Sequence, residues 1–194
     1  MRKIFLISLF ALVIFFFKPI YGEQLNSIKK NGVCVLFEEP VKNAAKEVVN
    51  IYPGLIAELE KTLKWKLDYE PTVLLIKNRQ TFRKMTKSDF VIAYAVPQKK
   101  FIVIDYSRMN ISPFNLGITL KHELCHLLLH RYIPEERLPK WLDEGVAQWV
   151  SDGIAEIIMD RKQSILTRVA FTKNYIPINE LAEKFPQNKQ ALLL

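Results

Sequence analysis

The chain has 194 residues, of which 49% are hydrophobic and 25% charged. It is therefore long enough for one domain with a packed core and too apolar for a disordered protein. The formal charge is +8, but Arg2, Lys3 and Lys18 supply three of these charges near the N-terminus, and the others are dispersed. This dispersal excludes a concentrated basic surface, so we expect no nucleic-acid partner.

Residues 1–22 have the pattern of an export signal. A basic start precedes an apolar run, 4–17, in which only Ser8 is polar. That length is typical of a signal-peptide core and short for a membrane span. Residues 20–22 read Ile-Tyr-Gly and do not provide small residues at both key positions of a cleavage site, so a retained N-terminal membrane anchor is the alternative. In both cases we expect residues 23–194 to form a domain in the periplasm or at the extracellular face of the membrane.

The next part of the chain alternates between the hydrophobic patterns of strands and helices, which predicts an α+β fold with a small mixed sheet. A helix interrupted near Pro53 and a hairpin-like link beginning at Pro97 are expected within it. The expected strands are 32–37, 72–76, 91–96 and 101–105, and the expected helices are 41–66 and 79–86.

A longer helix follows, with Ser112 as its cap, Pro113 in its first position and Pro134 just beyond its end. Residues 122–126 of this helix read His-Glu-Leu-Cys-His. His122 and His126 are four apart and share one face, so both imidazoles are available to one ion. Glu123 lies about 100° further round the helix, where its carboxylate is placed to act as a base rather than as a ligand.

Eighteen residues after His126, Glu144 occurs in Trp-Leu-Asp-Glu-Gly. We expect a helix here with Pro139 in its first turn and Gly153 as its stop. Folded back over the histidine helix, it would bring Glu144 to the two histidines. Two His, one Glu and a water form a known catalytic Zn²⁺ set. Taken alone, the histidine motif is equally compatible with two partly buried histidines bonded to backbone.

These two segments together resemble the gluzincin metallopeptidases of the peptidase MA-like group. The resemblance covers about thirty residues and implies His122, His126 and Glu144 as zinc ligands and Glu123 as the base. It also implies a zincin-like fold, in which an edge strand lies over the active-site helix and the glutamate helix follows. For that edge strand, 101–105 is the candidate, with an ordinary core strand as an equal alternative.

The sequence departs from the family at one position. Thermolysin-like members carry an Asp four residues after the glutamate ligand, where this chain has Gln148. An amide still accepts an imidazole N–H but does not raise its basicity as a carboxylate does. Asp143 is either a group that supports the ligands or a first-turn acid favoured by the helix dipole.

One further histidine could be a metal ligand, and the two cysteines of the chain could form a disulfide. His130 lies about 12 Å along the helix axis from His122, too far for both to bind one zinc, so we expect it either at the edge of the site or as a group that supports the ligands. Cys125 points away from His126 and is expected to be buried. Pairing of Cys34 with Cys125 and two buried thiols are both open.

The C-terminal residues, from Pro186 on, resemble the start of an amphipathic helix, and related domains continue with helices that close the cleft. We therefore expect the domain to be incomplete at its C-terminus, and no residue is assigned to stabilise an oxyanion.

The sequence thus predicts an exported, zinc-dependent metallopeptidase that acts on a peptide or protein substrate. Two alternatives remain open. One is a non-catalytic, envelope-anchored binding module with the same fold, and the other is a zinc hydrolase of a non-peptide amide.

Overall fold

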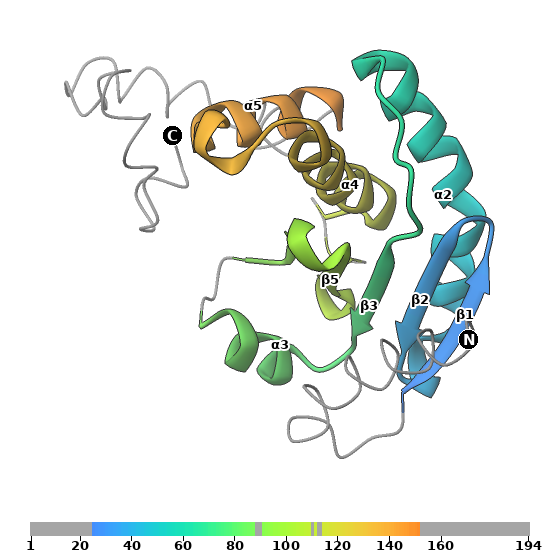
Figure 1. Cartoon of the computed structure of the whole chain (residues 1–194). Helices are drawn as coiled ribbons and strands as arrows, with labels where there is room; N and C mark the ends of the chain where they lie inside the picture. The colour runs from blue at the N-terminus through green and yellow to red at the C-terminus, as the bar shows by residue number, and fades with distance from the viewer. Residues whose placement is uncertain (1–24, 88–90, 110, 112–113, 152–194) are drawn as a thin grey trace, which may run out of the picture.

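The computed structural model describes residues 25–151 except 88–90, 110 and 112–113. Within this part the predicted α+β class is confirmed, with a five-stranded mixed sheet in the order β1-β2-β3-β5-β4 (Figure 1). The strands are β1 (Asn26–Lys30), β2 (Val33–Phe37), β3 (Thr72–Ile76), β4 (Ala93–Val96) and β5 (Phe101–Asp105). The α-helices are α2 (Lys42–Leu63), α3 (Arg79–Thr86), α4 (Leu116–Tyr132) and α5 (Lys140–Val150).

The central strands β3 and β5 pair in parallel and are covered on both faces. Alternate side chains point to opposite faces of a strand. Val73 and Leu75 accordingly join the large core beneath α2 and α4, whereas Leu74 and Ile76 join a smaller core against α3. Figure 1 shows α4 and α5 on one side of the sheet and α3 on the other. The helix that carries the histidines is therefore anchored in the larger core.

The interpretation of 101–105 as the edge strand is wrong, and the alternative of a core strand is confirmed. β5 lies between β3 and β4, and all five of its residues are buried. The edge on this side is β4, which pairs with β5 in antiparallel register. β4 also packs against α4, so a strand edge to which no described strand pairs still lies beside the histidine helix.

The interruption expected near Pro53 does not occur, and α2 continues through this residue. A proline inside a helix leaves the carbonyl four residues earlier without its N–H partner. Here that carbonyl belongs to Val49, and Asn31 Nδ2 donates to it over 3.0 Å. Asn31 and Gly32 form the two-residue turn between β1 and β2, both with positive φ, as a type I′ hairpin requires.

Several predicted boundaries are confirmed, whereas β4 begins at Ala93 rather than 91, α2 ends at Leu63 rather than 66, and the expected start of α4 is wrong. β3, α3 and β5 have the predicted bounds, and α4 ends at Tyr132 before Pro134. However, α4 begins at Leu116, because Asn115 caps it by accepting the Ile118 N–H over 3.1 Å. Ser112 and Pro113, expected to start this helix, lie outside the described residues.

Other predictions concern residues that the structure does not describe: the N-terminal segment 1–22, the stop at Gly153 and the C-terminal segment beginning at Pro186. Among the described residues, no helix combines the length and apolarity needed to cross a membrane.

Candidate metal centre

The site is formed where α5 crosses the histidine face of α4. The two helices are joined by a short segment, 133–139, that contains Pro134 and Pro139. A proline lacks the N–H needed inside a helix and disfavours helical backbone at the residue before it. The two prolines therefore end α4 and separate it from α5, and the chain reverses direction here. Leu138 and Ala147 pack into the large core and hold α5 against α4. The first turns of α5 therefore lie over the histidines.

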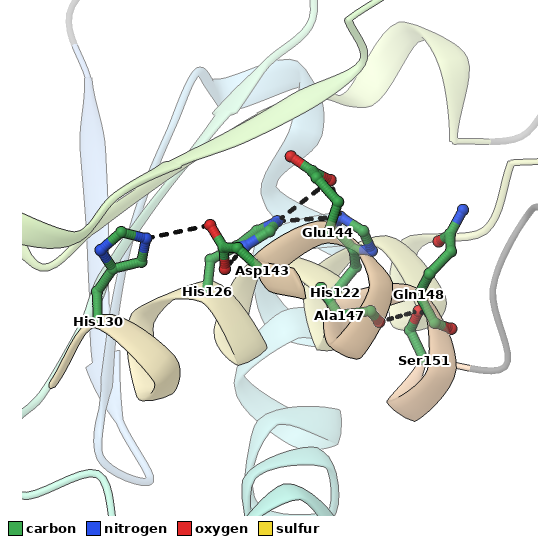
Figure 2. A network of polar contacts seen from close by, with 8 residues as sticks. All are labelled: His122, His126, His130, Asp143, Glu144, Ala147, Gln148 and Ser151. Atoms are coloured by element: carbon green, nitrogen blue, oxygen red, sulfur yellow. Dashed lines mark hydrogen bonds and ion pairs between the residues drawn. The ribbon is translucent and has the colours of Figure 1, made fainter. Parts of the chain in front are cut away.

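The predicted ligands converge. The Nε2 atoms of His122 and His126 lie 3.1 Å apart, and Glu144 Oε2 lies 3.6 Å from the first and 3.8 Å from the second. In Figure 2 the Glu144 carboxylate extends from α5 toward the two imidazole rings. Among the described residues, these three form the group of His, Cys, Asp and Glu side chains that could hold a metal ion, with ligand atoms within 4.8 Å of one another.

These separations fit a tetrahedral ion. Two ligand atoms bound at about 2.0–2.1 Å in tetrahedral geometry are about 3.3 Å apart. The three observed separations lie within roughly half an ångström of this value, so small side-chain movements would suffice. Two imidazole nitrogens and one carboxylate oxygen are also a donor set that suits zinc.

Glu123 is buried beside this cluster. Its residue is 6% exposed, yet the carboxylate makes no hydrogen bond or ion pair with any described residue. Burial raises the pKa of Glu123, while the nearby His122 and His126 act in the opposite direction. Burying a carboxyl group without a partner costs free energy. No described residue therefore engages this carboxylate in a hydrogen bond that would stabilise the fold.

Asp143 contacts the histidines, whereas the sequence left open whether it supports the ligands or is only a first-turn acid. Its Oδ1 lies 2.7 Å from His126 Nδ1, and its Oδ2 lies 3.1 Å from His130 Nε2 (Figure 2). Gln148, by contrast, makes no side-chain hydrogen bond to a described histidine, and in Figure 2 it extends away from the row of rings. The carboxylate that orients a histidine thus comes from the residue before Glu144, not from the position four residues after it.

The charges of the site are coupled. Burial by itself raises the pKa of both Asp143 and Glu144, but contacts with the histidines outweigh it and lower both values. For His126, burial lowers the pKa, yet the Asp143 hydrogen bond and the carboxylates of Glu123, Asp143 and Glu144 together raise it. Three carboxyl groups around two imidazoles would be partly neutralised by a divalent cation.

The remaining residues lie where predicted. His130 is one turn beyond His126 and contacts Asp143 instead of the three converging atoms. Cys125 is fully buried and Cys34 is 9% exposed, and both are free, so the interpretation as two buried thiols is confirmed.

Comparison with known proteins adds no relative: the chain matches no family model, no curated protein and no solved structure.

Proposed function

We propose that this protein is an exported zinc-dependent metallopeptidase, in which His122, His126 and Glu144 bind the metal and Glu123 is the general base. The observation that carries the proposal is the convergence of three suitable ligand atoms within 4.8 Å of one another on two crossing helices. The order of a mixed sheet, an edge strand beside the histidine helix and a following glutamate helix supports a zincin-like, gluzincin-type arrangement.

A bound zinc ion supplies Lewis acidity, which polarises a carbonyl and makes water acidic near neutral pH. The protein's own groups must then handle the proton. Glu123, which makes no hydrogen bond with a described residue, is available to take a proton from the attacking water and to return it to the leaving amine.

The peptide substrate and the location of the enzyme are also parts of this proposal. The outer edge of β4, to which no strand of the described part pairs, lies beside α4 and offers main-chain hydrogen bonds to an extended peptide. The pattern of residues 1–22 supports export, with either a cleaved signal or an anchor that keeps the domain at the membrane.

The non-catalytic binding module remains the second candidate because Gln148 replaces the family's acidic residue. Two observations count against it. Asp143 already provides a carboxylate to His126, and a purely structural metal site would have no use for the Glu123 carboxylate beside the ligands.

The test compares wild type, Glu123→Gln and the control Glu136→Gln, an exposed glutamate near the start of α5. Each zinc-loaded protein, with its natural flanking residues, is incubated with a peptide library, and cleavage is followed by mass spectrometry. We expect wild type and the control to cleave, and Glu123→Gln to lose about 10²- to 10⁴-fold in rate while it retains zinc.

Two other outcomes would identify the alternatives. Zinc binding without cleavage of peptides or of simple amides would favour the binding module. Cleavage of non-peptide amides alone would favour the other hydrolase. Activity that survives in Glu123→Gln would remove Glu123 from the mechanism.

A further inference from the structure

Two consecutive residues of α5 contact a row of three histidines on α4. His122, His126 and His130 are spaced four apart, so they lie one helical turn from each other on the same face. Glu144 lies against the first two, and Asp143 lies between the second and the third. Successive side chains of a helix diverge by about 100°. This divergence lets two neighbours on α5 point to two successive gaps in the row.

Asp143 connects the outer histidine to a ligand. Each of its two oxygens contacts a different ring, His126 Nδ1 at 2.7 Å and His130 Nε2 at 3.1 Å. An ionised carboxylate only accepts hydrogen bonds, so both of these nitrogens must carry a hydrogen. With the hydrogen on Nδ1, neutral His126 has its lone pair on Nε2, the atom that faces His122 and Glu144.

We propose that His130 is a positioning residue of the metal site, which holds Asp143 in the rotamer that fixes the tautomer and orientation of His126. This inference rests on the proposed metal site, and His130 itself would not touch the ion. Without His130, only one of the two hydrogen bonds to Asp143 remains. The Asp143 side chain is 14% exposed and could then turn toward water. The next residue on the same turn is Glu144, so a shift of Asp143 would also loosen the third ligand.

The first test measures zinc affinity by competition with a chelator. The variants are His130→Ala, which removes the hydrogen bond, and His130→Gln, which keeps an N–H donor of similar reach. Arg131→Ala is the control, because Arg131 is the adjacent residue but pairs with Asp68 away from the site. Loss of a group that supports a metal ligand typically costs 10- to 100-fold in affinity. We expect about a tenfold loss for His130→Ala, partial rescue by His130→Gln and no change for the control.

A double-mutant cycle separates positioning from direct ligation. In an Asp143→Ala background, His130→Ala should have no further effect on zinc affinity, because His130 acts through Asp143. If the full loss persists in that background, His130 acts independently of Asp143 and the proposal is overturned.

A measurement on the metal-free protein keeps this inference distinct from the proposed function. The chain has three histidines, so their ring nitrogens can be assigned in long-range ¹H–¹⁵N spectra. Wild type and His130→Gln should show His126 with its hydrogen on Nδ1, and His130→Ala should show a mixture of tautomers. The same His126 tautomer in His130→Ala as in wild type would refute the inference. If wild type binds no zinc, the proposed function fails, and the tautomer alone decides whether His130 positions His126.

Discussion

Two buried carboxylates in this molecule have opposite surroundings. Asp105, at the end of β5, is fully buried and accepts hydrogen bonds from Arg79 Nη1 and from the backbone N–H and the hydroxyl of Ser107. Glu123, in the middle of α4, is almost as buried but has no hydrogen-bond partner among the described residues. Buried polar groups are normally satisfied.

The contrast indicates what each group does. Asp105 links the end of β5 to the start of α3 because it accepts a hydrogen bond from Arg79. Arg79 also donates to the Val91 carbonyl. Both oxygens of the Asp105 carboxylate accept hydrogen bonds, which is typical of a group that stabilises a fold. Glu123 contributes no such contact and lies beside three converging ligand atoms. A carboxylate that lies next to a ligand cluster and makes no hydrogen bond with a described residue is better explained by chemistry than by stability.

The largest expected difference between these carboxylates is in the free energy of unfolding. Asp105→Ala should destabilise the protein by about 2–3 kcal/mol, because Arg79 loses its carboxylate partner and two Ser107 donors lose their acceptor. The figure is below the usual range for buried pairs since the Arg79 side chain is 23% exposed. Glu123→Gln should change stability by less than about 0.5 kcal/mol, or increase it, because a buried acid becomes a neutral amide. Urea denaturation of both variants checks this, and equal losses would erase the distinction.

A smaller effect on stability is expected at the hairpin turn between β1 and β2, where Asn31 donates to a carbonyl of α2. Asn31→Ala removes the donor to the Val49 carbonyl and should cost about 1 kcal/mol in urea denaturation. In a Pro53→Ala background the helix supplies its own N–H to that carbonyl, so the cost of Asn31→Ala should fall. An identical cost in both backgrounds would show that the hydrogen bond does not compensate for Pro53.

The smallest expected effect on stability concerns a buried hydroxyl group that has no hydrogen-bond partner among the described residues. Thr119, in the first turn of α4, is 3% exposed, and its Oγ1 has no partner among the described residues. Thr119→Val replaces this hydroxyl by a methyl group of similar size. We expect no loss of zinc binding and a gain of about 0.5–1 kcal/mol in stability. A variant that folds normally but loses zinc affinity would assign Thr119 to the site.

Much of the fold was predictable because local patterns determine it. β3 is a short apolar run that follows Pro71 and ends before the polar pair Lys77-Asn78. Asn78 then caps α3 by accepting the Gln80 and Thr81 N–H groups. β1 was missed because it is polar and mostly exposed, although the Asn31-Gly32 pair indicated a hairpin. The position of β5 inside the sheet depends on its parallel pairing with β3, from which α3 and β4 separate it in sequence.

The candidate site shows the same limit. Helical spacing was enough to place His122 beside His126, and a helix folded back over them was enough to bring Glu144 close. The choice between Asp143 and Gln148 as partner of His126 depends on the angle at which α5 crosses α4. That angle follows from core packing, and no local pattern in the sequence encodes it.

The most direct test of this account is zinc binding by the purified protein, measured as metal content and as affinity in chelator competition, for wild type beside Glu144→Ala. The account predicts about one zinc per wild-type chain and a loss of affinity of at least tenfold in the variant, because a four-coordinate site loses a protein ligand. Circular dichroism of both proteins controls for folding. A folded wild type that holds no zinc, or a Glu144→Ala variant with unchanged affinity, would contradict the proposed metal centre.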